Sequence, residues 1–422
     1  MTVGKLKPNK NFEGLNKNYL FTEIKKRVNE FKEKSGREVI SLGVGDVAYP
    51  LPPSAVRAMV DAVQELGDNA RFRGYPEENG YGFLKSAIVK YYLSMGVEIS
   101  EDEVYIGEGA KSDASCFLDV FNKPAVAIPS PVYPVYSDSA IMGGYKIEYI
   151  NCTKQNGFKP LPTGLDSTPH AVWLCSPNNP TGVTLSYSDV EQWVDYAIKT
   201  GSLILYDSAY SAFIAGNAPR SVFEIAAAKT CAVEFGSFSK MAGFTNLRLS
   251  WVIIPKELNA CGASVGGLWK RRQSAKFNGV SYPVQRAGEA VLSPVGQAEC
   301  KEVICKYMAI TREIRAFLQS KGVWCVGGEN SPYVWMECLH GMTSWEFFDF
   351  LLYNAGVVGT PGVGFGQSGE GFFRLSGLTS PTLARAALDR MERCFELAKN
   401  SAAAQHFSAK PQRRLFNILI SK

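Results

Sequence analysis

The chain has 422 residues, of which 46% are hydrophobic and 20% charged, a composition typical of a globular protein long enough for two domains. Its 45 basic and 40 acidic residues leave a net charge of +5, which is too small at this length to favour a nucleic-acid-binding protein. No apolar run approaches the ~20 residues of a membrane span, and the ten cysteines form no CxxC pair and no cluster with the three histidines, so we expect free thiols, no metal and a cytoplasmic location.

The first nineteen residues contain four lysines and no apolar run, which predicts a solvated arm and not a secretory signal. Residues 54–67 follow with apolar side chains at helical spacing, which predicts a helix with Val56, Val60 and Val63 on one face. Further along, Ser188 and Glu191 have the spacing of a capping box and predict the start of another helix.

Short apolar runs between the helical patterns predict strands at 104–106, 125–128, 171–175, 203–206, 231–235 and 251–254. Strands that alternate with helices predict a mostly parallel sheet covered on both faces, and therefore an α/β fold.

After about residue 290 the pattern changes to that of a smaller α+β unit. It predicts a helix at 302–320, a strand at 332–338, a helix from Ser344, a strand at 372–376 and a last helix that opens at Ser380-Pro381. We therefore divide the chain into an arm with part of a small domain (1–48), a large domain (49–288), a small C-terminal domain (289–400) and a tail (401–422).

Polar side chains follow the ends of three predicted strands of the large unit. Asn179 follows 171–175, Asp207 and Tyr210 follow 203–206, and Lys240 follows 231–235, with Arg248 eight residues further on. Ligands of open α/β sheets bind outside the carboxyl ends of the strands. Each motif alone is equally typical of a turn or a polar loop, but their joint order indicates one site.

Taken together, these motifs resemble the class I/II aminotransferases in order and spacing, over nearly the whole chain. The resemblance rests on Asn179-Pro180-Thr181-Gly182, Asp207-x-x-Tyr210, Ser237-x-Ser239-Lys240, Arg248, and Arg374 within 371–376. It implies a pyridoxal 5′-phosphate (PLP)-dependent enzyme of fold type I, with a seven-stranded sheet in the large domain. It also implies a homodimer with shared active sites, whose partners are a small amino acid and a 2-oxo acid.

The resemblance gives each of these residues a role toward PLP, which acts as an electron sink. Lys240 would bind the cofactor covalently and move the substrate Cα proton, for which its amine must be neutral. Asp207 would hold the ring N–H, and Asn179 and Tyr210 would donate to the ring oxygen. The ring would stack on Tyr133, and the phosphate would lie against Ala110, Lys111, Ser237, Ser239, Arg248 and the neighbouring subunit's equivalent of Tyr75. Gly109-Ala110-Lys111 stands between a strand and a helix, so its backbone N–H groups are expected to face an anion.

A finer resemblance is to the LL-diaminopimelate aminotransferases of lysine biosynthesis, and it rests on segments between residues 18 and 376, among them 18–21, 42–46, 72–75, 109–113, 277–279 and 360–366. It implies that Arg374 clamps the α-carboxylate, that Glu78 pairs with the distal ammonium, and that Lys111 and Asn278 reach the distal carboxylate. Tyr19, Gly45, Tyr133 and Asn179 complete the implied substrate site. Glu78 and Asn278, like Tyr75, would serve the site of the neighbouring subunit.

Several residues depart from the pattern of that family and leave other functions open. They are Tyr49, Pro76, Glu108, Asn246 and Ser250, of which the last two flank Arg248 where glycine is usual. The alternatives are a broad-specificity aminotransferase, a PLP-dependent C–S lyase, and a non-catalytic PLP-binding regulator. No DNA-binding segment of the kind that such regulators carry is recognisable in the sequence.

Overall fold

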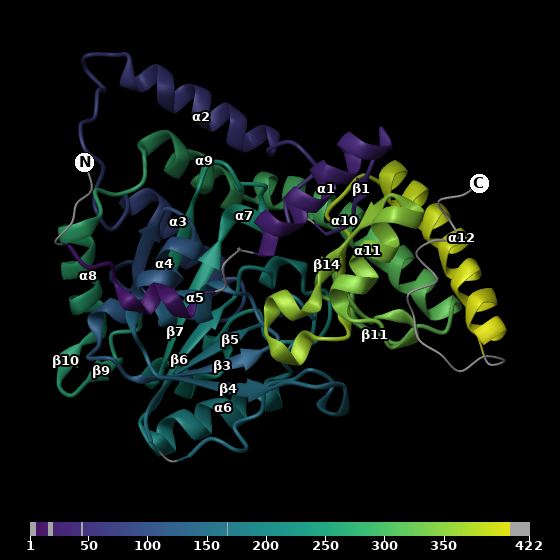
Figure 1. The fold of residues 1–422 in the computed structure, drawn as a ribbon. Coiled ribbons are helices and arrows are strands. Elements are labelled where there is room, and N and C mark those ends of the chain that lie inside the picture. Colours follow the sequence, from purple (N-terminus) through teal and green to yellow (C-terminus); the bar gives the residue numbers. More distant parts are fainter. Residues whose placement is uncertain (1–5, 16–19, 44, 167, 406–422) are drawn as a thin grey trace.

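The structure is a computed structural model that describes residues 6–15, 20–43, 45–166 and 168–405, with the backbone alone described from 397 onward. The chain forms a large lobe around a seven-stranded sheet and a small lobe at one end of it (Figure 1). No described helix is long and apolar enough to cross a membrane. All ten cysteines are free thiols.

The central sheet has the strand order β2-β8-β7-β6-β5-β3-β4. Its strands run parallel except β8, which is antiparallel to both β2 and β7. The strands are β2 Val104–Gly107, β3 Ala125–Ser130, β4 Ile147–Asn151, β5 His170–Cys175, β6 Leu203–Asp207, β7 Ala232–Ser237 and β8 Ser250–Ile253. The predicted mostly parallel sheet is confirmed, and β4 is an edge strand that we did not predict.

Helices cover both faces of this sheet because successive side chains of a buried strand point to opposite faces. In β5, Val172 and Leu174 belong to one buried cluster, while Ala171 and Trp173 belong to another. The first cluster includes side chains of α3 (Gly82–Leu93), α6 (Tyr187–Thr200) and α9 (Tyr282–Leu292). The second includes side chains of α4 (Ala110–Cys116), α5 (Val135–Gly143) and α8 (Val265–Lys276).

The start of α6 differs from the predicted one by two residues. The capping box consists of Ser186 and Asp189, and the hydroxyl of Ser186 accepts from the backbone N–H of Asp189. The predicted pair, Ser188 and Glu191, was therefore wrong. Both pairs have the same spacing, and Asp189 adds an ion pair with Lys159 at 2.6 Å that favours the earlier start.

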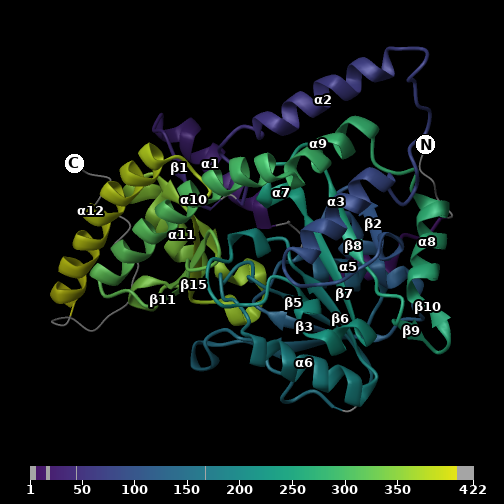
Figure 2. The same cartoon turned by 180° about the vertical axis from the view of Figure 1, so that it is seen from behind.

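The helix predicted at 54–67 is present as α2 (Pro53–Leu66), but its apolar face is not covered. Val56, Val60 and Val63 are 43%, 51% and 56% exposed. Instead, α2 packs on α9 through its small residues, which include Ala55 and Ala62, and lies along the outside of the large lobe (Figures 1 and 2). Periodicity predicted the helix and not the partner that covers its valines.

The small lobe has an antiparallel sheet of order β11-β12-β15-β14 and a parallel pair β1-β13. Its strands are β1 Ile40–Ser41, β11 Cys325–Gly327, β12 Tyr333–Glu337, β13 Val357–Val358, β14 Thr360–Pro361 and β15 Phe372–Ser376. Its helices are α1 Leu20–Ser35, α10 Pro294–Ser320, α11 Ser344–Ala355 and α12 Pro381–Gln405. A two-stranded hairpin, β9 Asn259–Ala260 and β10 Ala263–Ser264, precedes α8 in the large lobe.

Two helix ends of the small lobe differ from their predicted positions. Helix α10 begins at Pro294 and not at residue 302, because the Ser293 hydroxyl caps it and Pro294 fits its first turn. Helix α12 continues to Gln405, five residues into the predicted tail, and the rest of that tail lies outside the described residues.

Candidate active site

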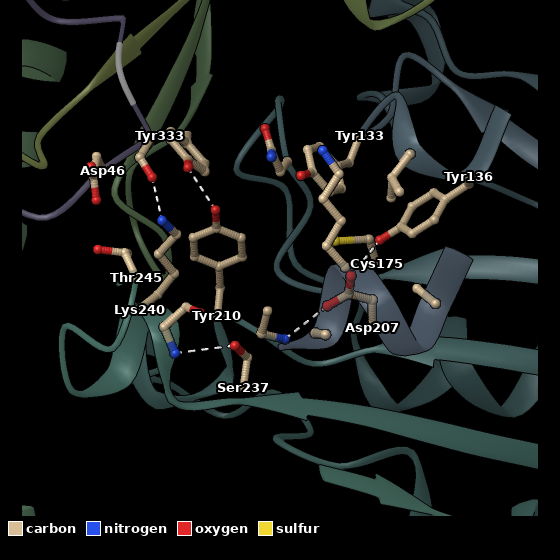
Figure 3. Close-up of a pocket in the computed structure, with 18 of the residues that line it drawn as sticks. Asp46, Tyr133, Tyr136, Cys175, Asp207, Tyr210, Ser237, Lys240, Thr245 and Tyr333 are labelled. Carbon is tan, nitrogen blue, oxygen red and sulfur yellow. Dashed lines mark hydrogen bonds between the residues drawn. The ribbon is translucent and has the colours of Figure 1, made fainter. Parts of the chain in front are cut away.

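A cavity of about 500 Å³ lies where β5, β6 and β7 end against the small lobe (Figure 3). The structure brings most of the predicted site residues to it. Those that line it are Gly45, Ala110, Lys111, Tyr133, Asn179, Asp207, Tyr210, Ser237, Ser239, Lys240, Arg248 and Arg374. Placement after the carboxyl ends of parallel strands, which the sequence indicated, gathers Asn179, Asp207, Tyr210 and Lys240. Arg374 comes from β15 of the small lobe.

Lys240 enters the cavity from the short helix α7 (Phe238–Met241) that follows β7. The hydroxyl of Ser237 accepts from the backbone N–H of Ser239 at 3.1 Å, which caps this helix. The amine donates to the carbonyl of Gly45 (Figure 3). Burial lowers the pKa of Lys240 to about 8, with smaller effects of Asp46, which raises it, and of Arg374 and Arg248, which lower it. A sizeable neutral fraction of this amine near pH 8 suits it to nucleophilic and base chemistry.

Asp207 lies at the end of β6, with its carboxylate at the inner wall of the cavity. Its oxygens accept from the Tyr136 hydroxyl at 2.5 Å and from the Ala209 N–H at 3.0 Å. Burial raises the pKa of Asp207, while these two hydrogen bonds lower it. A buried carboxylate with no cation bonded to it among the described residues is suited to pair with a positively charged ring N–H.

Tyr136 is a residue of this site that we did not predict. Its ring stacks on Trp173 with centroids 4.3 Å apart, which fixes the hydroxyl against Asp207 (Figure 3). The available signal was the triplet Pro-Val-Tyr, which occurs twice in succession at 131–136 and places Tyr136 three residues after Tyr133. Tyr133 itself lines the cavity and meets Tyr136 edge to face at 6.0 Å.

Arg374 of β15 is 1% exposed and is held from several sides. It donates to the Asn179 side-chain oxygen and to the Gly43 carbonyl, both at 2.6 Å. Its Nε has no hydrogen-bond partner among the described residues. Because buried donors are nearly always paired, this fixed guanidinium fits a ligand carboxylate.

Tyr333 of β12 is a second residue that we did not predict. Its hydroxyl lies 2.6 Å from that of Tyr210, and the Arg374 guanidinium lies 4.3 Å from the centroid of its ring. Tyr333 thus links the predicted carboxylate site to Tyr210 (Figure 3). No local sequence pattern indicates this contact, because it joins β12 of the small lobe to the segment that follows β6 in the large lobe.

Arg248, Ser237 and Ser239 form the side of the cavity suited to an anion, and Gly109 packs against Arg248. Arg248 has a left-handed backbone with φ 61° and donates to the Ser239 hydroxyl at 3.2 Å. A Cβ on Gly109 would collide with the Arg248 guanidinium, so glycine permits this close approach. Of the N–H groups of Gly109-Ala110-Lys111 that we expected to face an anion, that of Gly109 does not, because it donates to the Ser250 hydroxyl at 2.8 Å.

Three other predicted residues, Tyr75, Glu78 and Asn278, do not line the cavity of this chain. Tyr75 is 87% exposed, and Glu78 accepts a hydrogen bond from Ser274. Asn278 precedes Gly279, whose backbone packs against the carbonyl of Glu77, so these residues lie on neighbouring loops. Tyr19 lies outside the described residues.

Comparison with known proteins shows the family to which this chain belongs. Residues 37–390 match the family described as aminotransferase class I and II. The chain is 44% identical over 401 residues to the LL-diaminopimelate aminotransferase of Agathobacter rectalis, covering 91% of this chain and 98% of that protein. It is 45% identical over 407 residues to the enzyme of the same name from Prochlorococcus marinus, covering 92% and 99%. The solved L,L-diaminopimelate aminotransferase of Chlamydomonas reinhardtii superposes with a TM-score of 0.88 at 34% identity, covering 93% of this chain and all of that one.

Proposed function

Because the chain belongs to the aminotransferase class I and II family, we propose that it is an LL-diaminopimelate aminotransferase, which moves an amino group between LL-diaminopimelate and 2-oxoglutarate. In lysine biosynthesis this reaction links tetrahydrodipicolinate, L-glutamate and water to LL-diaminopimelate and 2-oxoglutarate. The relatives with that name, at 44% and 45% identity over nearly the whole chain, support the substrate. The free thiols agree with a reducing compartment such as the cytoplasm.

The single observation that carries the proposal is the cavity that places Lys240, Asp207 and Arg374 around one space. The residues fit PLP: an amine with a lowered pKa, a buried carboxylate to which no cation of the described chain is bonded, and Arg248 packed against Gly109. When bound, PLP supplies an electron-withdrawing ring that stabilises negative charge on the substrate Cα.

Three side chains of the cavity have separate roles in the proposed reaction. Arg374 binds the substrate α-carboxylate through its planar fork, which orients the Cα–H bond toward Lys240. The neutral amine of Lys240 removes the proton from the substrate Cα in one half-reaction and returns a proton to Cα in the other. Arg374 also holds the oxygen of the Asn179 amide, which leaves the amide nitrogen to donate to a ligand oxygen.

We extend the proposal to a homodimer whose sites are completed across the interface. The exposed valines of α2, together with Phe72 (67% exposed) and Tyr75 (87% exposed), are large apolar side chains on one stretch of chain. Contiguous exposed apolar surface is typical of an interface between proteins. A dimer that buries this stretch would bring Tyr75, Glu78 and Asn278 toward the cavity of the partner.

Val60→Asp tests that interface. We expect the dimer dissociation constant to rise at least about a hundredfold, since two-fold symmetry places two unpaired carboxylates in an apolar contact. Sedimentation velocity measures the change, and turnover should fall with the dimer. Ile198→Asp on α6 is the matched control, because Ile198 is also a helical aliphatic residue and is 52% exposed. If Val60→Asp stayed dimeric, the interface would have to lie on another part of the surface.

Glu78→Gln tests the substrate. We expect kcat/KM for LL-diaminopimelate to fall about ten- to a hundredfold, because a charge-assisted hydrogen bond to the distal ammonium is lost. The half-reaction with L-glutamate should be nearly unchanged, because glutamate has no distal ammonium. Pre-steady-state absorbance changes with each donor measure the two rates.

Glu77→Gln is the control for that experiment, because it changes an exposed carboxylate on the same loop. Equal losses with both donors would mean that Glu78 supports the loop or the dimer and does not read the substrate. A wild-type enzyme that is inert toward LL-diaminopimelate but active on other amino acids would contradict the proposed substrate. It would still agree with aminotransferase activity.

A further inference from the structure

Ser250 joins a buried carboxylate to the backbone of the turn beside Arg248. Its hydroxyl donates to Asp113 at 2.5 Å and accepts from the N–H of Gly109 at 2.8 Å. Ser250 is fully buried and Asp113 is 3% exposed, so water does not compete for these bonds. The three residues come from β8, from α4 and from the connection between β2 and α4.

The turn at Gly109 is a conformation that depends on outside support. Its backbone has φ 114°, which favours glycine, and Arg248 packs so closely on it that no Cβ fits. Without the Ser250 hydroxyl, the Gly109 N–H would be a buried donor without an acceptor, and such a donor destabilises the conformation that buries it. A different orientation of this peptide would also move the surface on which Arg248 rests.

Asp113 in turn fixes the orientation of the hydroxyl. A serine hydroxyl can rotate, and donation to the carboxylate leaves its lone pairs directed at another donor. The carboxylate packs directly on Gly107 at the end of β2, where a Cβ would collide with it. Burial raises the pKa of Asp113 to about 7; the bond from Ser250 lowers it, Glu108 raises it, and Arg272 and Arg248 lower it.

We propose that Ser250 and Asp113 are positioning residues that hold the Gly109 turn, and with it Arg248, in the geometry that receives the phosphate of PLP. The inference rests on the proposed function, since it concerns the same cavity. The two hydrogen bonds of Ser250 support a turn whose shape is set before the ligand binds, which favours affinity through preorganisation.

The test compares two ligands that differ only in the phosphate. Titration of the cofactor-free full-length chain with PLP and with pyridoxal, followed by the absorbance of the bound ring, gives a dissociation constant for each. We expect Ser250→Ala to raise the dissociation constant of PLP about tenfold, which is the scale of one lost hydrogen bond at a buried site. The dissociation constant of pyridoxal should change by no more than about twofold. Asp113→Asn keeps an acceptor for the hydroxyl, so its loss for PLP should be smaller, about threefold or less.

Ser221→Ala is the matched control. The Ser221 hydroxyl also donates to a buried carboxylate, Glu234 at 2.6 Å, and accepts from a backbone N–H, that of Phe223 at 3.1 Å, but it does not line the cavity. It should lower the melting temperature and leave both dissociation constants unchanged.

Three results would overturn the inference. The first is unchanged PLP affinity in Ser250→Ala, and the second is an equal loss for PLP and pyridoxal, which would indicate general damage to the cavity. The third, should Ser250→Ala not fold, is a loss in Asp113→Asn that is equal for the two ligands or larger than about tenfold. A wild-type chain that binds no PLP would instead contradict the proposed function, and it would contradict this inference as well.

Discussion

Lys240→Ala is expected to lower kcat by at least about 10⁴-fold while the chain still folds, because it removes both the covalent link to the cofactor and the base that moves the Cα proton. The fold should tolerate the change. Since burial lowers the pKa of Lys240 from 10.5 to about 8, the fold disfavours the charged amine, and this cost is present below pH 8. Removing the amine at pH 7 therefore relieves an electrostatic cost, which offsets the loss of the hydrogen bond to Gly45.

Reductive trapping separates this role from a merely structural one. Borohydride treatment should attach the cofactor to the wild-type chain at Lys240, as seen by peptide mass, and should attach none at that position in the variant. Lys276→Ala is the control, because it removes an exposed lysine that pairs with Asp119 outside the cavity. Turnover within tenfold of wild type would mean that another residue performs the chemistry.

The sequence predicted the central sheet well because its strands are continuous apolar runs. A parallel strand that is buried on both faces is apolar along most of its length, as β5 is after His170, and this signal does not depend on neighbours. Strand β4 was not predicted because it lies at the edge of the sheet, where the partly exposed Glu148 and Tyr149 interrupt the apolar run. The start of α6 was misplaced because two overlapping segments satisfy the same capping pattern.

The candidate site was predictable where a residue follows a strand end and less so where it depends on contacts between lobes. Asn179, Asp207 and Lys240 are placed by single strands, so their neighbours in sequence indicated them. Tyr333 reaches Tyr210 from the sheet of the small lobe, which no local pattern encodes. The valines of α2 show the same limit: helical periodicity gives a face, whereas the surface that covers it belongs to another part of the structure or to another chain.

Asp207→Asn is expected to lower kcat about 10²- to 10³-fold with little loss of cofactor affinity, because the amide keeps the shape of the carboxylate and removes its charge. A neutral group at this position no longer favours a protonated ring nitrogen, so the ring withdraws electrons less strongly when the Cα proton leaves. The cofactor-free variant should keep most of its stability at neutral pH, because the amide oxygen can accept from the Ala209 N–H and the Tyr136 hydroxyl can accept from the amide nitrogen. Burial raises the pKa of Asp207, so ionisation costs folding free energy as the pH rises above the unfolded value, and asparagine has no such cost.

Glu234→Gln is the contrast that makes the Asp207 result specific. Glu234 of β7 is also buried with a raised pKa, but its carboxylate accepts from donors of the chain itself: Tyr92, Ser208, Ser221 and the N–H of Val222. Its amide variant should lower the melting temperature, because one of its two polar atoms can no longer accept, and leave kcat unchanged. Asp207→Asn should show the opposite pattern, with kcat reduced and stability kept. If kcat were instead retained in Asp207→Asn, the carboxylate would serve to hold Tyr136 and Ala209 in place, and the ring nitrogen would need another partner.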